Sequence, residues 1–385
     1  MRVLFITQIV DRTHPNLGAI HGWIAALARE VEYVHVLALA TGVAELPPNV
    51  QIHSLGKDRG NGKPRQLQIF HSVAGGLALR RQVDIFFPHM VPRYALLVAP
   101  YRLIFRIPTV MWYAHNSADL QLRLANLCVD RFVSASQDSF PLGPAKCSVV
   151  GMGIDTDLFH PPDAAPPSPG SFLHGNRERS DAGTPFSMKA GQAGGKRTQF
   201  LCLGRISPRK ELDTLISAAD LLANHWKRRD VEIVVAGAPF APEDHAYLDH
   251  LRSRVGKLNL EDVVRFAGGI PHSETASWVQ TCDFFVNLHV EGGIGKSVLE
   301  AMSCGKPALV STPTYYERFP QYGERFLFAP RSHESLAEKM REALDLSPRE
   351  RIEIGQDLRR WVVESHNLAG QMSRVARVLR EVRGG

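Results

Sequence analysis

Cysteine is scarce in this sequence: 385 residues contain five cysteines, and none forms a C-x-x-C pair. An odd number of scattered cysteines fits neither a disulfide framework nor a structural zinc site, so we expect a cytoplasmic protein. The opening apolar run is too short for the core of a signal peptide, and no later stretch supplies the roughly 20 apolar residues of a membrane-spanning helix. Neither secretion nor a transmembrane anchor is expected.

Negative charge is in short supply only in the first half. Residues 1–159 hold 15 Lys and Arg against 11 Asp and Glu, residues 160–198 hold 5 against 3, and residues 199–385 hold 25 against 25, which gives the net charge of +6. Such an excess suits an anionic membrane surface or an acidic acceptor, although an ordinary solvated face is an equally good interpretation. Nucleic acid is not expected as a partner, because no stacking aromatics are interleaved with the basic residues.

The chain divides in the middle. Residues 160–198 are rich in Pro, Gly and Ser and lack an apolar period, which is typical of a flexible linker or insert. On either side, in 1–159 and 199–365, short β-branched or aliphatic runs alternate with segments of helical period. This alternation predicts an α/β fold of two Rossmann-like domains with parallel sheets. Because ligands of such sheets bind at the carboxyl ends of the strands, we expect a site in a cleft between two facing sheets.

Small residues open the first helix of the chain. Gly18 and Ala19 precede the helical segment 20–30, and their minimal side chains would let a phosphate or sugar approach the backbone amides. A plain turn glycine is the alternative and the more common case.

Two histidines follow predicted strands of the first domain. His115 and Asn116 come after the strand 109–113, where an imidazole can hydrogen-bond a ligand hydroxyl. His89, after the strand 85–87, is a similar candidate for contact with an acceptor or sugar. A structural histidine is the alternative at both positions.

The first strand after the linker, 199–204, leads directly into a basic turn. Arg205 offers a planar guanidinium and Lys210 a point charge, a suitable pair for holding a diphosphate. A basic helix start without an anion would be disfavoured by the helix dipole, so we favour the ligand interpretation.

A glycine-rich loop follows the strand 284–288. Its glycines and the start of the next helix can direct backbone amides at a phosphorylated ligand, and Glu300, one turn into that helix, can accept hydrogen bonds from a ribose diol. The candidate donor-binding residues of this loop are Glu291, Gly292, Gly293, Ile294, Gly295, Lys296 and Ser297.

Gly295-Lys296-Ser297 also ends like the phosphate-binding loop of NTPases. That motif requires a glycine five residues before Gly295, and this position is Val290, so the match fails.

Together these segments resemble the retaining glycosyltransferases of family 4, which have the GT-B fold of two Rossmann-like domains and act on nucleotide-sugars. The resemblance covers nearly the whole chain outside the linker. Its most specific parts are segments 204–210, 295–307 and 153–161. It also implies that a last helix, within 366–385, crosses back to the N-terminal domain.

The resemblance implies roles for individual residues. Arg205 and Lys210 would hold the donor pyrophosphate, Glu300 the ribose and His115 the transferred sugar. Gly18 and Ala19 would match the family's glycine pair.

Several positions depart from the family pattern. Its paired glutamates stand eight apart, but eight residues before Glu300 is Gly292, and the available acid, Glu291, lies one position early. Ala19 replaces the second glycine of the first pair. Glu211 stands where a glycine usually follows Lys210.

The expected function is retaining sugar transfer from a nucleotide-diphospho-sugar to a hydroxyl of a lipid-linked, polysaccharide or small-molecule acceptor, without a metal or other cofactor. Cell-envelope glycan, glycolipid or polysaccharide synthesis, at the cytoplasmic side of a membrane, fits this expectation. A nucleotide-sugar epimerase of the same fold and a non-catalytic sugar-nucleotide binding protein are the alternatives.

Overall fold

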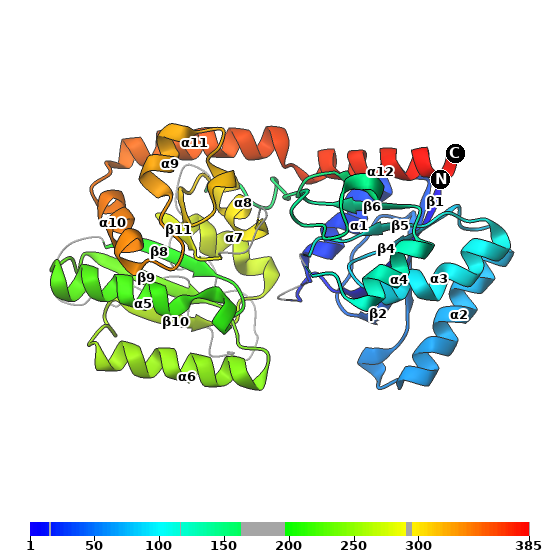
Figure 1. The fold of residues 1–385 in the computed structure, drawn as a ribbon, viewed down its shortest axis with the longest axis horizontal. Coiled ribbons are helices and arrows are strands. Elements are labelled where there is room, and N and C mark those ends of the chain that lie inside the picture. Colours follow the sequence, from blue (N-terminus) through cyan, green and yellow to red (C-terminus); the bar gives the residue numbers. More distant parts are fainter. Residues whose placement is uncertain (15–16, 116, 163–196, 290–294, 385) are drawn as a thin grey trace. The chain divides into compact units, whose positions relative to one another are not determined.

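The computed structural model describes residues 1–14, 17–115, 117–162, 197–289 and 295–384 (Figure 1). The chain forms two compact units. Unit 1 comprises Met1–Asp155 with His366–Gly385, and unit 2 comprises Thr156–Ser365. The first break therefore precedes the predicted boundary at 159. Within the described ranges, no helix has the length and apolar character needed to cross a membrane.

Unit 1 is built on parallel strands in the order β3-β2-β1-β4, followed by β5-β6-β7. Backbone bridges between Phe86 and Thr109 and between His89 and Trp112 connect β4 to β5. The strands are β1 (Arg2–Val10), β2 (Tyr33–Thr41), β3 (Val50–Ser54), β4 (Ile85–Pro88), β5 (Val110–Trp112), β6 (Arg131–Ser134) and β7 (Cys147–Val149). The strands predicted at 85–87 and 109–113 are confirmed as β4 and β5. The edge strand β3 was not predicted, because it is largely half-exposed and lacks an apolar run.

Helices cover both faces of this sheet. Alternate side chains of β1 point to opposite faces, so Val3 and Phe5 pack with α1 and α12, whereas Leu4 and Ile6 pack with α2 and α3. The helix α4 packs beside α3. The helices of unit 1 are α1 (Ala19–Glu30), α2 (Lys63–Leu79), α3 (Pro92–Phe105), α4 (Leu120–Cys128) and α12 (Leu368–Gly384).

Unit 2 contains a parallel sheet in the order β10-β9-β8-β11-β12. Its strands are β8 (Thr198–Leu203), β9 (Val231–Ala236), β10 (Val264–Gly268), β11 (Phe284–Asn287) and β12 (Ala308–Val310). Its helices are α5 (Leu212–Asp220), α6 (Pro242–Lys257), α7 (His272–Thr281), α8 (Lys296–Ser303), α9 (Pro320–Phe326), α10 (His333–Leu344) and α11 (Pro348–Ser365). In both units the strands are parallel and the first strand lies inside the sheet, as in a Rossmann-like domain. The predicted fold class is therefore confirmed.

The last helix, α12, follows unit 2 in sequence but belongs to unit 1. Gln371, which is fully buried, donates from Nε2 to the Gly151 carbonyl at 2.6 Å, and Arg374 Nε donates to the Val150 carbonyl at 2.8 Å. These side chains satisfy backbone groups that have no strand partner, which fixes α12 against the end of the first chain segment.

The buried His89 should make the stability of unit 1 depend on pH. Burial lowers the pKa of His89 to about 3, whereas an unfolded histidine titrates near 6.5. The unfolded chain therefore binds the extra proton, and the free energy of unfolding should fall by about 3 kcal/mol between pH 7 and pH 4 through this residue. Urea unfolding at a series of pH values measures this. His89→Phe should flatten the dependence, and His333→Phe, at a half-exposed position of unit 2, should leave it unchanged; an unchanged slope in His89→Phe would contradict the assignment.

Candidate donor-binding site

The predicted basic turn lies at the carboxyl end of β8, directly before α5. Gly204 leaves the strand with a φ of +143°, in a region that favours glycine. Its N–H donates to the Ala236 carbonyl at 2.9 Å, and Ile206 N–H donates to Ala238 at 3.2 Å. The loop that carries Arg205 is therefore fixed to the end of β9.

The backbone of Gly237 approaches this loop closely. A Cβ atom at Gly237 would lie 1.8 Å from the Gly204 carbonyl oxygen, a separation that no side chain permits. Gly237 N–H also donates to Gly268 at 2.7 Å. Backbone contacts thus hold the ends of three neighbouring strands together.

Lys210 is half-buried at the end of this turn. Burial lowers the pKa of its ammonium group, and the nearby Arg205 charge lowers it further, although Cys202 acts in the opposite direction. Within the described ranges its ammonium group has no hydrogen-bond or ion-pair partner. Two neighbouring cations, one of them partly desolvated, would be stabilised by a bound anion.

A buried acid orients Arg205. Asp244 Oδ2 lies 3.8 Å from Arg205 Nε and accepts from the backbone amides of Phe240 and Ala241, at 3.2 and 3.1 Å. These amides, with a smaller contribution from Arg205, hold the pKa of Asp244 below its usual range. The sequence analysis missed Asp244, and its only sequence signal is a pair of acids in the first turn of a proline-initiated helix.

Glu211 explains one departure from the family pattern. The Glu211 backbone has a φ of +53°, in the left-handed region where glycine is favoured. The position therefore has the backbone conformation that suits the family's usual glycine, although glutamate stands there. Glu211 also accepts from Arg331 Nε at 3.1 Å.

The second predicted loop is described from Gly295 onward; Glu291, Gly292, Gly293 and Ile294 lie outside the described residues. Gly295 N–H donates to the hydroxyl of Tyr315, a buried side chain that the sequence analysis did not identify. Burial raises the pKa of Tyr315 to about 12, so its hydroxyl stays protonated. Because this amide already has a partner, it is not the free donor that the sequence suggested.

Glu300 is buried in the first turns of α8. Its Oε1 lies 2.9 Å from Nζ of Lys296, one turn earlier, and this buried oxygen has no hydrogen bond to any described group. Ser297 lies between them, half-exposed. Burial lowers the pKa of the neighbouring His272 to about 4, with a smaller effect from Lys296, so the His272 imidazole is neutral. The start of α8 therefore combines one carboxylate with one ammonium group.

His115 is exposed after β5, and Asn116 lies outside the described residues. The Ser117 N–H donates to His115 Nδ1 at 3.1 Å, so Nδ1 is an acceptor. In the neutral ring this leaves the proton on Nε2, which can donate to a ligand hydroxyl.

Two other predicted contacts of unit 1 need correction. His89 is buried, stacks on Phe5 at 5.8 Å and meets Trp23 edge-on at 5.7 Å, so it has a packing role and no access to an acceptor. The Gly18 N–H already donates to the His14 carbonyl at 2.9 Å, so this amide is not available to a ligand; Ala19 begins α1 beside it.

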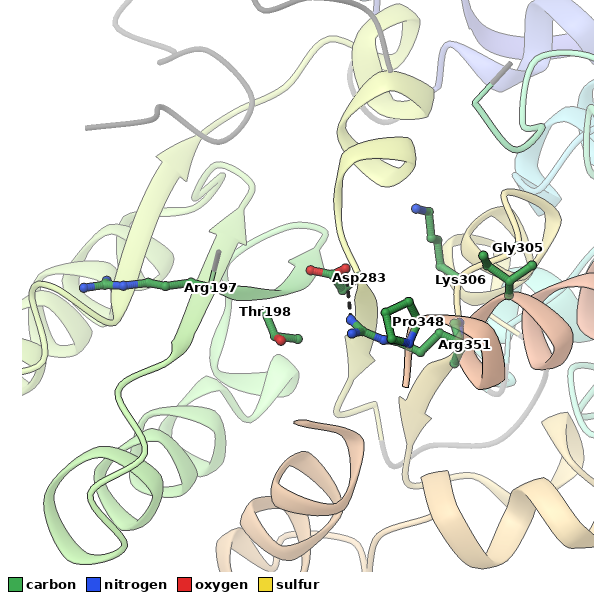
Figure 2. A pocket seen from close by; sticks show the side chains of 9 residues that line it. Arg197, Thr198, Asp283, Gly305, Lys306, Pro348 and Arg351 are labelled. Carbon is green, nitrogen blue, oxygen red and sulfur yellow. Dashed lines mark hydrogen bonds and ion pairs between the residues drawn. The ribbon is translucent and has the colours of Figure 1, made fainter. Parts of the chain in front are cut away.

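A cavity of about 410 Å³ lies at the opposite edge of the unit 2 sheet, at the amino ends of β8, β11 and β12 (Figure 2). Asp283 and Arg351 within it pair at 3.1 Å (Figure 2). None of the predicted site residues lines this cavity. Its lining residues are Arg197, Thr198, Asp283, Gly305, Lys306, Pro307, Pro348, Arg351 and Ile352.

Comparison with known proteins finds a family match in the second half of the chain. The family model "Glycosyl transferases group 1" matches residues 184–361, which include the Arg205–Lys210 turn and the start of α8. The match covers 178 of the 385 residues, and this part of the chain is similar to the glycosyl transferases group 1.

Two curated relatives are similar to part of the chain. The chain is 31% identical over 176 residues to D-inositol 3-phosphate glycosyltransferase of Kineococcus radiotolerans, covering 45% of this chain and 36% of the relative. It is 34% identical over 128 residues to alpha-monoglucosyldiacylglycerol synthase of Streptococcus pneumoniae, covering 33% and 27%. These matches span about a third of the relatives' own length.

The fold of this chain is similar to that of a solved protein along nearly the whole chain. Alr3699/HepE of Anabaena, crystallised with UDP and glucose, has a TM-score of 0.72 and 19% identity, covering 98% of this chain and 99% of that one. At this identity the likeness shows the fold alone. In the part of the chain that the structure describes, no cluster of three or more His, Cys, Asp or Glu could hold a metal ion.

Proposed function

We propose that this protein transfers a sugar from a nucleotide-diphospho-sugar to an acceptor hydroxyl with retention of the anomeric configuration. The observation that carries the proposal is the pair Arg205 and Lys210 at the carboxyl end of β8, with a half-buried ammonium group that has no partner among the described residues. A diphosphate has two charged groups, and the planar Arg205 guanidinium and the Lys210 ammonium group of the same turn can each bind one of them.

The nucleoside part of the donor would bind at the start of α8. The buried Glu300 carboxylate is ion-paired with Lys296 and can accept further hydrogen bonds, which a ribose diol would supply. The solved Anabaena protein of the same fold was crystallised with UDP and glucose, which supports a nucleoside diphosphate as the ligand class here.

In the proposed reaction, the bond between the anomeric carbon and the diphosphate oxygen breaks while the acceptor oxygen forms a bond on the same face of the sugar. The leaving phosphate oxygen takes the acceptor proton. Arg205 and Lys210 stabilise the negative charge that develops on the diphosphate, so the proposal requires no metal or other cofactor. We assign to His115 Nε2–H a hydrogen bond to a hydroxyl of the transferred hexose.

For the acceptor we propose a lipid-linked or polysaccharide hydroxyl in cell-envelope glycan, glycolipid or polysaccharide synthesis, with the protein acting as a peripheral enzyme on the cytoplasmic side of a membrane. One relative is named as a synthase of a glucosyldiacylglycerol, which supports a lipid acceptor.

Thermal unfolding with a panel of UDP, GDP, ADP, CMP and their sugar conjugates, without metal, tests the donor site. One nucleoside diphosphate should raise the midpoint, because it binds only the folded state, and Arg205→Ala and Glu300→Ala should abolish the shift. No shift with any member would contradict the proposed ligand class.

Product analysis with the stabilising sugar-nucleotide then tests the reaction. A sugar found on an acceptor supports transfer. An isomerised donor would instead show an epimerase, and tight binding without any product, across lipid, polysaccharide and small-molecule acceptors, would show a binding protein.

A further inference from the structure

The outward face of α4 is apolar. Leu122 and Ala125 face the core, as expected, but Leu120, Leu124 and Leu127 are spaced i, i+4, i+7 on another face and are 71%, 44% and 76% exposed. A helix on a protein surface normally presents polar residues to water, and a helix that is apolar on both faces has a second partner.

The neighbouring helices extend this apolar character. Ends of α3 and α2 expose Leu103, Ile104 and Leu79, each at 70% or more. The three helices lie side by side on one face of the unit 1 sheet, α2 against α3 and α3 against α4 (Figure 1). Seven of the exposed large apolar side chains of the described chain belong to these helices: Leu67, Leu79, Leu103, Ile104, Leu120, Leu124 and Leu127.

The same helices are strongly basic. Residues 60–128 contain eight Lys or Arg and only two acids, Asp84 and Asp119. Both acids are engaged elsewhere: Asp84 pairs with Arg2 and Arg383, and Asp119 caps the start of α4 by accepting from Leu122 N–H. Among the described residues, the basic side chains of this surface that have no acidic partner are Lys63, Arg65, Arg80, Arg81, Arg93, Arg106 and Arg123.

We infer that this α2–α4 surface binds an anionic lipid bilayer. Unpaired cations attract anionic headgroups, and the exposed leucines among them can enter the boundary between headgroups and acyl chains. A second copy of this chain would bring the same unpaired cations together and is therefore disfavoured by like-charge repulsion. This inference rests on the peripheral location proposed above and assigns it to a surface. The surface lies in unit 1 and uses no residue of the Arg205–Lys210 turn or α8, so loss of vesicle binding can be distinguished from loss of nucleotide binding.

Sedimentation of the full chain with vesicles tests this inference. Vesicles of phosphatidylcholine with roughly a third phosphatidylglycerol should retain the protein at low salt, whereas phosphatidylcholine alone should not, and added salt should release it. The triple variant Leu120→Ser/Leu124→Ser/Leu127→Ser should lower the partition coefficient about tenfold or more through lost apolar contact. Arg106→Ala/Arg123→Ala should lower it by a similar factor through lost charge.

A matched control uses exposed residues of unit 2: Arg349→Ala/Ile352→Ser removes one cation and one apolar side chain from α11 and should not alter retention. Circular dichroism and thermal midpoints confirm that every variant is folded. Absence of retention by anionic vesicles, or equal retention of the control and the triple variant, would overturn the inference. So would sedimentation equilibrium showing a dimer that the triple variant abolishes, because the surface would then be covered by a second copy.

Discussion

Replacing Arg205 or Lys210 with alanine should lower the turnover of sugar transfer about 10²- to 10³-fold, because each removes a preorganised charge from the leaving diphosphate. Both side chains follow β8, and Lys210 is the more desolvated of the two. The effect should fall on both KM and kcat, since the two cations bind the diphosphate of the donor and negative charge on the leaving group grows as the glycosidic bond breaks. Steady-state kinetics with the nucleotide-sugar identified by thermal shift measures it.

Arg209 provides the matched control for this prediction. It lies in the same turn, is exposed, and has no acidic partner among the described residues. Arg209→Ala removes the same formal charge at nearly the same place and should leave turnover within about twofold of the parent. If all three variants were equally impaired, the loss would reflect the general field of the turn and not a specific contact with the diphosphate.

Gly237→Ala should destabilise unit 2 by about 3 kcal/mol, because the new methyl group would overlap the Gly204 carbonyl oxygen. Relief requires the ends of β8 and β9 to separate, which would also displace Arg205, the residue that follows Gly204. Chemical unfolding should therefore show a lower midpoint, and the folded variant should lose stabilisation by nucleoside diphosphates.

Gly76→Ala is the control for the glycine substitution. Gly76 lies within α2, and a Cβ atom there would have no neighbour within 4 Å. Alanine favours the helix over glycine by up to about 1 kcal/mol, so this variant should be as stable as the parent or slightly more stable. A Gly237→Ala variant of normal stability and normal ligand binding would show that the strand ends can separate without cost.

The two loops that the sequence identified in unit 2 have different local surroundings. The β8 turn is fixed by backbone hydrogen bonds to β9 and by Asp244, whereas the start of α8 is fixed by the Tyr315 hydroxyl on Gly295. Arg205 is therefore oriented by a residue on α6, and Gly295, at the start of α8, is held by a residue after β12. Neither partner is adjacent in sequence to the residue that it supports.

The sequence by itself determined the fold class and most strands, because buried parallel strands are short continuous apolar runs, separated here by segments of helical period. It also placed Arg205, Lys210 and Glu300 directly after strands of unit 2, since motif spacing is local. The sequence marked Glu211 only as a departure from the family pattern, and the structure shows its left-handed backbone.

Only the tertiary structure decided which polar groups are already engaged. His89, Gly18 and Gly295 were equivalent to the other candidates in sequence, but packing buries the first, and His14 and Tyr315 occupy the amides of the other two. The exposed leucines of α4 likewise resemble core residues in sequence, since an apolar period does not indicate whether a second face has a partner. Burial and hydrogen-bond occupancy depend on residues distant in the chain, and no local pattern specifies them.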